Sequence, residues 1–87
     1  MDVHKIFLVF IMKAKIYTTT VCPACNMAKE FLKLKKVEFE ILNVENDDRL
    51  AQEMIEKSGQ FSVPVIEIGE KIIVGFNKSA IVEAIER

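Results

Sequence analysis

A pair of cysteines, Cys22 and Cys25, lies between a β-prone segment and a helical one, and this position limits the folds open to the chain. Residues Ala14 to Thr18 favour a strand, and the residues between Thr18 and Cys22 favour a turn. Pro23 is tolerated in the first turn of a helix, because the N–H that it lacks would have no partner there. Since a separation of three residues is close to one helical turn, the sequence predicts a strand, a turn and a helix that begins at the cysteine pair.

The helix after the cysteine pair is predicted from apolar residues that recur at helical spacing. Its expected apolar face comprises Ala24, Met27, Ala28 and Phe31. We expect this helix to end near Lys35 and Lys36, because basic side chains suit the negative end of a helix dipole. Val37, Phe39 and Ile41 then alternate with acidic residues, which is typical of a strand.

A second helix is predicted after this strand. Asn46 or Asp47 can cap its beginning, and Ser58-Gly59 should stop it. The apolar stripe expected along this helix consists of Leu50, Ala51, Met54 and Ile55.

Two strands and a last helix complete the predicted elements. Val63 to Ile68 and Lys71 to Val74 favour strands. Only Gly69-Glu70 separates them, and a two-residue link with glycine first suits a tight hairpin turn of the primed type. Gly75 breaks the second strand, and Asn77 can cap a helix after it. The residues of this helix expected to face inward are Ile81, Val82 and Ile85.

The predicted order of elements, β-α-β-α-β-β-α, indicates an α/β fold with a mixed four-stranded sheet flanked by three helices. The first β-α-β unit implies a parallel pair with a right-handed crossover, and the hairpin implies an antiparallel pair. We assign the domain to residues 12–87. Residues 1–11 do not fit this plan, and we interpret them as an N-terminal extension that catalysis does not need. An extra edge strand over Ile6 to Phe10 is the alternative. A membrane anchor is disfavoured, because the seven apolar residues from Ile6 to Met12 are too few to span a bilayer.

The composition of the chain favours a single globular domain. The 87 residues are enough for one domain, and 51% apolar with 29% charged residues is typical of a globular chain. The 12 basic side chains nearly balance the 13 acidic ones, which gives no reason to expect binding to nucleic acid or to an anionic membrane. Two cysteines are too few for a secreted disulfide framework, and no small-residue cleavage site follows the apolar stretch near the start, so we expect a cytoplasmic protein. We also expect a monomer.

The cysteine pair has the chemistry of a redox centre. At or beside the N-cap of a helix, Cys22 meets unpaired N–H groups and the positive end of the helix dipole, which favour its thiolate. The thiolate is the attacking species in disulfide exchange. Cys25, one turn further on, should be more buried. We therefore predict that Cys22 attacks a substrate disulfide and that Cys25 resolves the mixed disulfide.

Other uses of the cysteine pair stay open at this point. A structural zinc site takes four ligands, whereas this chain offers two cysteines and one histidine, His4. Two chains could pool their cysteines around a metal or an iron–sulfur cluster. The pair could also form two inert thiols, or a structural disulfide that a reducing cytosol disfavours. A Cys-x-x-Cys motif near a βαβ pattern is nevertheless typical of a thioredoxin-like redox motif.

Three motifs together resemble those of glutaredoxin-like redoxins of the thioredoxin superfamily, including the redoxins that reduce ribonucleotide reductase. They are Cys22-Pro23-Ala24-Cys25, Ser62-Val63-Pro64 and Gly75-Phe76-Asn77, and the resemblance covers nearly all of residues 12–87. It implies a thioredoxin-like fold, and it implies that Pro64 is cis and packs beside the cysteines. It also implies that the Val63 backbone pairs with an extended thiol substrate. The remaining residues that the resemblance places around the substrate are Thr19, Thr20, Pro23, Gly75, Phe76 and Asn77.

The chain departs from the glutathione-using members of this family at three places. Thr19 stands where they usually carry a lysine, Ala24 where they carry an aromatic residue, and Gly75-Phe76 where they show Gly-Gly. The activity that the resemblance implies is dithiol–disulfide oxidoreduction with no bound cofactor. The alternatives are a dimeric carrier bridged by a metal or an iron–sulfur cluster, and a non-catalytic binding module that keeps only the fold. The partners implied are disulfide-containing proteins, with ribonucleotide reductase as one candidate. Thioredoxin reductase or glutathione would be the electron donor.

Overall fold

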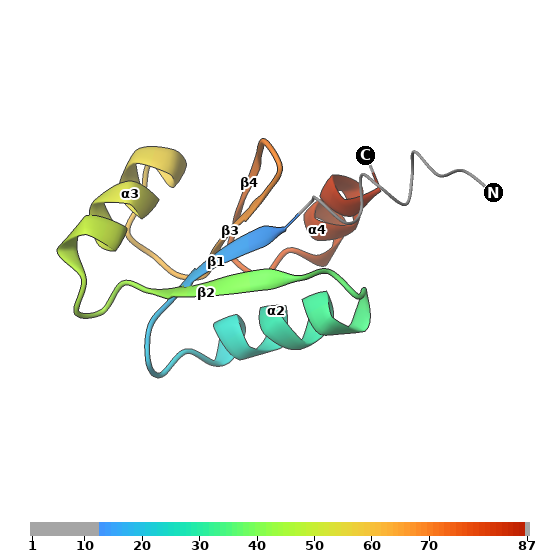
Figure 1. Ribbon diagram of the computed structural model, residues 1–87, viewed down its shortest axis with the longest axis horizontal. Helices are drawn as coiled ribbons and strands as arrows, with labels where there is room; N and C mark the ends of the chain where they lie inside the picture. The colour runs from blue at the N-terminus through green and yellow to red at the C-terminus, as the bar shows by residue number, and fades with distance from the viewer. Residues whose placement is uncertain (1–12, 87) are drawn as a thin grey trace.

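The computed structural model describes residues 13–86, which form four strands and three helices in the predicted order (Figure 1). The strands are β1 (Ala14–Thr18), β2 (Phe39–Asn43), β3 (Val65–Ile68) and β4 (Lys71–Val74). The helices are α2 (Pro23–Leu34), α3 (Asp48–Ser58) and α4 (Lys78–Ile85). The N-terminal extension, residues 1–11, lies outside the described residues.

The strands form one mixed sheet with the order β2-β1-β3-β4. β1 pairs with β2 in parallel, with Ile16 beside Ile41, and with β3 in antiparallel, with Ile16 beside Ile66. β3 and β4 form the antiparallel hairpin. Gly69 in its two-residue turn has φ +59°, a conformation that glycine adopts readily, as the primed turn requires. The predicted mixed four-stranded sheet and the order of its elements are therefore confirmed.

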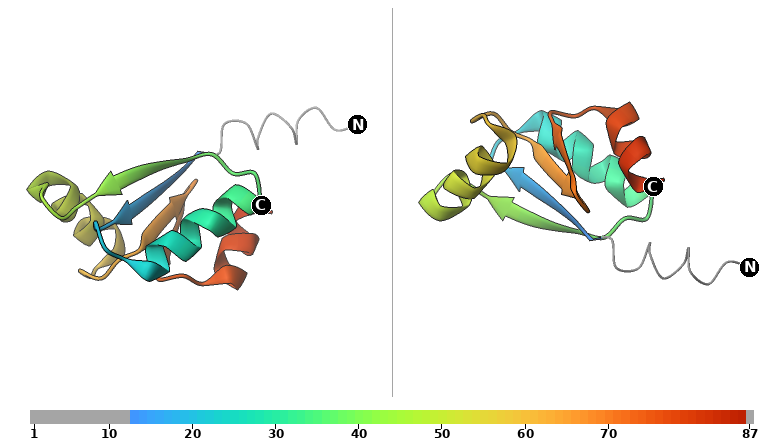
Figure 2. Two further views of the ribbon diagram at one scale, coloured as in Figure 1. Left: turned by 90° about the horizontal axis from the view of Figure 1, so that it is seen from below. Right: turned by 90° about the horizontal axis from the view of Figure 1, so that it is seen from above.

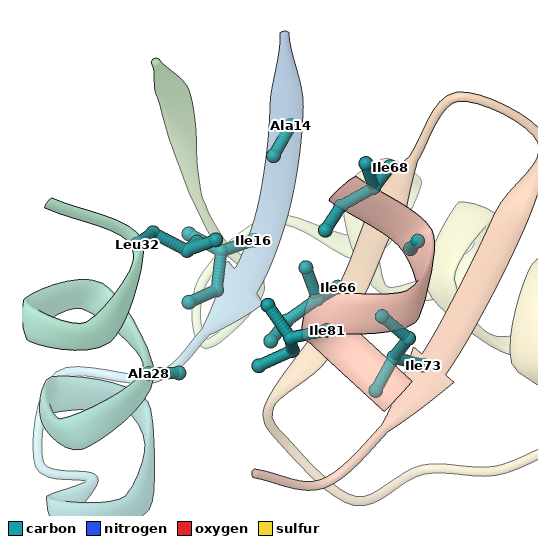
Figure 3. Close-up of a cluster of buried hydrophobic side chains, with 9 residues drawn as sticks. Ala14, Ile16, Ala28, Leu32, Ile66, Ile68, Ile73 and Ile81 are labelled. Carbon is teal, nitrogen blue, oxygen red and sulfur yellow. The ribbon is translucent and has the colours of Figure 1, made fainter. Parts of the chain in front are cut away.

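Helices α2 and α4 cover one face of the sheet and lie side by side (Figure 2). Between these helices and the sheet is the larger cluster of buried side chains, in which Ile16 and Ile66 of the strands meet Leu32 of α2 and Ile81 of α4 (Figure 3). The other buried members of this cluster are Ala14, Ala28, Ile68, Ile73 and Ala84. Burial of these apolar side chains holds the two helices on the sheet.

Helix α3 packs on the opposite face, where Met54 meets Tyr17 and Val65. The Tyr17 hydroxyl reaches the edge of this small cluster and donates a hydrogen bond to Glu53. The ammonium group of Lys57 lies 3.0 Å from the Tyr17 oxygen and 2.7 Å from a carboxylate oxygen of Glu67 on β3. This polar group links α3 to β1 and β3 at the edge of the apolar cluster.

The ends of the helices follow local capping rules. Asp47 and Asn77 cap α3 and α4 as predicted, and each side-chain oxygen accepts a backbone N–H of the first turn. At the end of α2 the backbone N–H groups of Lys36 and Val37 donate to the carbonyls of Lys33 and Leu32, which is the Schellman pattern. Lys36 adopts φ +60° there, a conformation that glycine usually supplies.

Two strand boundaries and two orientations differ from the predictions. β2 begins at Phe39 rather than Val37, because the N–H of Val37 donates to Leu32 at the end of α2, and β3 begins at Val65 rather than Val63, after the cis Val63–Pro64 bond. Met27 was expected on the apolar face of α2, but 56% of it is exposed. Ile41 is 53% exposed, since β2 is an edge strand that the helices cover only in part.

Candidate active site

The segments that carry the sequence motifs lie together at one edge of the sheet. Tyr17 pairs with Val65, so the antiparallel register places the end of β1 opposite Pro64. The backbone N–H of Gly75 donates to the Pro64 carbonyl at 2.8 Å, which places the end of β4 at the same edge. The turn that leads to Cys22 leaves from the end of β1. The cysteine turn, the proline loop and the start of the last helix therefore share this edge.

Cys22 and Cys25 form a disulfide at the beginning of α2. Cys22 is the N-cap of the helix, and its sulfur accepts the backbone N–H of Cys25 at 3.1 Å. Its carbonyl accepts the N–H of Asn26, which is the first regular bond of the helix. Cys22 is 9% exposed and Cys25 is 0% exposed, so the outer sulfur belongs to the residue that meets the unpaired helix N–H groups.

Pro23 and Ala24 between the cysteines give the turn its shape. Pro23 occupies the first position of α2 and is exposed at the surface, as the sequence predicted. Ala24 is half-buried and its methyl group adds no polar atom to the site. The short linker thus leaves the helix N-terminus uncovered by a large side chain.

The peptide bond between Val63 and Pro64 is cis, which confirms the conformation expected for it. Pro64 is buried, while Val63 is half-buried at the surface of the loop. Within residues 13–86 the backbone N–H and carbonyl of Val63 make no backbone hydrogen bond. These two groups are thus left to pair with an extended chain in the way that a strand adds to a sheet edge.

The turn before Cys22 is held by two residues that the sequence did not single out, Asn43 and Glu45. The backbone N–H of Thr20 donates to the Glu45 carboxylate at 3.0 Å, and the Asn43 side-chain amide donates to the Thr20 hydroxyl at 3.3 Å. The other end of the Asn43 side chain accepts the N–H of Glu45 at 2.8 Å. Their one signal in the sequence is their place at the end of a strand parallel to β1 (Asn43) and two residues beyond it (Glu45), which puts both at the same sheet edge.

The residues after β4 form the far side of this edge. Gly75 adopts φ +79°, which glycine tolerates without strain. The Phe76 ring turns toward α2 and meets the ring of Phe31 edge-on, with 5.9 Å between centroids. The side-chain oxygen of Asn77 is engaged by the N–H of Ala80 in capping α4. Phe76 and Asn77 therefore have structural contacts in addition to the substrate contacts expected of them.

No group of three or more potential metal ligands occurs among residues 13–86. The same part of the chain contains no helix that is both long and apolar enough to cross a membrane.

Comparisons with known proteins give a consistent picture. Residues 14–73 match the family model described as Glutaredoxin. The chain is 48% identical over 73 residues to a glutaredoxin-like 8.6 kDa protein in the rubredoxin operon of Clostridium pasteurianum, a match that covers 84% of this chain and 97% of that protein.

Two solved structures share the fold. The glutaredoxin from Archaeoglobus fulgidus superposes with a TM-score of 0.80 at 28% identity, covering 93% of this chain and 94% of that one. The glutaredoxin-like NrdH-redoxin from Escherichia coli superposes with a TM-score of 0.74 at 26% identity, covering 83% of this chain and 93% of that one. A disulfide at a helix N-terminus on this fold is suited to reversible thiol–disulfide exchange.

Proposed function

Because the chain belongs to the glutaredoxin family, with thiol–disulfide redox chemistry as its function, we propose that it is an oxidoreductase that reduces disulfides in other proteins. The observation that carries this proposal is the Cys22–Cys25 disulfide at the N-terminus of α2, with Cys22 as the helix cap. A disulfide in that position can open and close without any change in the fold, because only the first turn of one helix is involved. The reaction needs no bound cofactor.

In the proposed reaction the reduced protein begins with the thiolate of Cys22. The thiolate attacks one sulfur of a substrate disulfide, a new Cys22–substrate disulfide forms, and the second substrate sulfur leaves as a thiolate. The thiolate of Cys25 then attacks the Cys22 sulfur, which releases the first substrate sulfur and closes the Cys22–Cys25 disulfide. Two electrons have passed from this protein to the substrate, and both substrate sulfurs end as thiols after protonation.

Helix α2 assists the first step through the groups that surround the Cys22 sulfur. The N–H of Cys25 already points at this sulfur, and the positive end of the helix dipole favours negative charge there. Cys25 is fully buried, so an incoming disulfide meets Cys22 first. These contacts support an attacking role for Cys22 and a resolving role for Cys25.

The proline loop supplies a docking edge for the substrate backbone in this proposal. The free N–H and carbonyl of Val63 would pair with an extended segment that carries the substrate cysteine, in an antiparallel or parallel strand-like contact. Main-chain pairing can bind substrates of many sequences, because it does not depend on any particular substrate side chain. This property suits a reductase that acts on protein disulfides.

Thioredoxin reductase is the proposed electron donor, in preference to glutathione. Relative to the glutathione-using members of the family, Thr19 removes a cation and Ala24 removes an aromatic contact. Hydrogen bonds to charged groups contribute about 1.5–3 kcal/mol each, so the loss of such contacts weakens glutathione binding. The E. coli NrdH-redoxin, to which the chain is similar, has a thioredoxin-like activity profile, which agrees with this choice. The backbone N–H groups at the start of α4 can still bind a carboxylate of glutathione, so we expect slow reduction of the protein by glutathione.

The test supplies the protein separately with two reducing systems and uses insulin disulfides as the common target. One system is NADPH with thioredoxin reductase, and the other is glutathione with glutathione reductase and NADPH. We expect faster insulin reduction with thioredoxin reductase, and no catalysis in either system with the Cys22→Ser variant. Efficient turnover with glutathione alone would overturn the choice of donor. Failure of the chemically reduced protein to reduce insulin would overturn the proposed activity.

A further inference from the structure

An apolar groove of about 480 Å³ runs between the outer side of α2 and the beginning of α4. Its walls are the side chains of Met27, Phe31, Leu34 and Phe76. Met27 is 56% exposed and Leu34 is 76% exposed, so neither side chain is needed to fill the core. Contiguous exposed apolar surface of this kind marks a site of interaction more often than scattered apolar residues do.

The groove begins close to the disulfide. Asn26, at its near end, lies one helical turn beyond Cys22 and donates its backbone N–H to the Cys22 carbonyl. Leu34, at its far end, lies eight residues further along α2, which corresponds to about 12 Å at 1.5 Å per residue. A segment in the groove would therefore run along α2 and away from the sulfur that a substrate approaches.

Lys78 lines the groove, and a second lysine, Lys35, lies beside it over the ring of Phe31. Lys35 places its ammonium group 5.5 Å from the centre of the Phe31 ring. Lys78 lies over both rings, 5.8 Å from Phe31 and 5.9 Å from Phe76. Within residues 13–86 neither ammonium group forms an ion pair with a carboxylate. Glu30, the acidic residue that lines the groove, makes its ion pair with Lys33 instead, at 3.5 Å.

We propose that this groove docks an apolar segment with adjacent carboxylates, carried by the protein whose disulfide Cys22 reduces. The proposal rests on the proposed function, because it names the surface that selects the substrate of that reaction. Apolar side chains of the segment would remove Met27 and Leu34 from water, and its carboxylates would pair with Lys35 and Lys78. Ion pairs formed at the edge of an apolar contact are less screened by solvent than isolated surface pairs.

The groove and the Val63 edge would act on different parts of one substrate. The Val63 backbone would align the residues beside the reacting cysteine, whatever their side chains. The groove would contact substrate side chains at a distance from that cysteine and would therefore distinguish between substrate sequences, whereas backbone pairing does not. Selectivity among protein disulfides would thus come from α2 and α4, while the exchange itself depends on the cysteine turn.

A binding experiment tests the groove without any disulfide chemistry. The probe is a fluorescent, cysteine-free helical peptide with leucines along one face and glutamates beside them, titrated into the oxidised protein. Two comparison peptides replace its glutamates by lysines or its leucines by serines. We expect the leucine replacement, and each of the variants Met27→Ser and Leu34→Ser, to weaken binding by about tenfold, since burying an apolar side chain is worth roughly 1.4 kcal/mol or more. The lysine replacement should also weaken binding, because it turns attraction to the two lysines into repulsion. The matched control is Ile41→Ser, which changes an apolar residue on β2 that is about as exposed as Met27 and should bind as the wild-type protein does.

A kinetic experiment then links the groove to the reaction. The three peptides are joined by a flexible linker to a cysteine held in a disulfide, and the rate of their reduction by the reduced protein is compared with that of bis(2-hydroxyethyl) disulfide. We expect the leucine–glutamate peptide to react fastest, with an advantage that Met27→Ser and added salt both diminish. The rate with the small neutral disulfide should not change in this variant. Equal binding and equal rates for all three peptides would overturn the docking proposal, whereas no reduction of any disulfide would overturn the proposed function.

Discussion

The backbone N–H of Cys25 points at the sulfur of Cys22, with 3.1 Å between nitrogen and sulfur. This contact joins the two members of the disulfide by a hydrogen bond as well as by a covalent bond. A thiolate at Cys22 would accept the same N–H and would feel the positive end of α2. The two cysteines are therefore unequal, although only two residues separate them.

The inequality predicts which cysteine reacts first. Treatment of the reduced protein with a limiting amount of iodoacetamide near neutral pH should alkylate Cys22 before Cys25, because the thiolate is the reactive form and Cys25 is buried. Peptide mass spectrometry after digestion measures the ratio of the two products. Cys22→Ser serves as the control and should be alkylated slowly. Faster labelling of Cys25 in the wild-type protein would reverse the assigned roles.

The division of roles predicts that Cys25→Ser traps the reaction halfway. Cys22 in this variant should still attack a protein disulfide, but no neighbouring thiolate remains to release the product. Mixed disulfides with insulin chains should accumulate and should be visible on non-reducing gels, then disappear with dithiothreitol. Turnover of insulin disulfides by Cys25→Ser at the wild-type rate would show that the second cysteine is not the resolving group.

Lys36 offers a prediction about stability alone. It adopts φ +60° at the end of α2, where a side chain is disfavoured and glycine is not. Lys36→Gly should therefore raise the free energy of unfolding by up to about 1 kcal/mol, as measured by urea denaturation. The matched change Lys33→Gly, inside the same helix, should lower it by roughly 0.5–1 kcal/mol. Destabilisation by both substitutions would mean that the Lys36 side chain contributes more than its backbone conformation costs.

The hydrogen-bonded group of Tyr17, Glu53 and Lys57 beneath α3 predicts that the free energy of unfolding falls at low pH. The hydrogen bond from Tyr17, with Lys57 nearby, holds the pKa of the Glu53 carboxyl below its usual value. A carboxyl with a lowered folded-state pKa adds stability above its unfolded-state pKa, and this stability is lost as the pH falls through the folded-state pKa. Glu53→Gln should therefore be less stable than the wild-type protein near neutral pH, by at most about 1 kcal/mol because the carboxylate is partly exposed.

The free energies of unfolding of the wild-type protein and Glu53→Gln should converge as the pH is lowered. As the pH falls below the usual glutamate pKa of about 4.3 and then through the lower folded-state pKa of Glu53, the wild-type protein should lose more stability than Glu53→Gln, since the variant has no carboxylate at this position to protonate. Urea denaturation at a series of pH values measures the difference. Glu56→Gln, which changes an exposed residue of the same helix, is the control and should follow the wild-type curve. A Glu53→Gln curve parallel to the wild-type curve would contradict the prediction.

Several local features of the fold could be predicted because their causes are local. The cap at Asn77 and the stop at Gly59 depend on the chemistry of single residues and their nearest backbone neighbours. The hairpin at Gly69 depends on a backbone conformation that glycine adopts without cost. The position of Cys22 at the beginning of α2 follows from the strand before it and the proline after it. Each of these features was predicted within a residue or two.

The polar contacts between distant elements could not be predicted in this way. Lys57 and Glu67 lie ten residues apart and Tyr17 lies a further forty residues from Lys57, yet the three meet because α3 crosses beneath β1 and β3. Thr20 meets Glu45 because β1 and β2 end at the same edge of the sheet. Nothing in the spacing of these residues along the chain indicates that they touch.

The order of the elements, the strand–turn–helix with the cysteines and the caps of the helices could be predicted from the sequence, since they depend on periodicity and on interactions within a few residues. Which apolar side chains remain outside the core depends on the packing of the elements against one another. Met27 has the helical spacing of a core residue, but α2 turns Cys25, Ala28 and Leu32 toward the sheet and leaves Met27 in the groove beside α4. Hydrophobic periodicity marks a face of a helix, whereas burial depends on which neighbouring element covers that face.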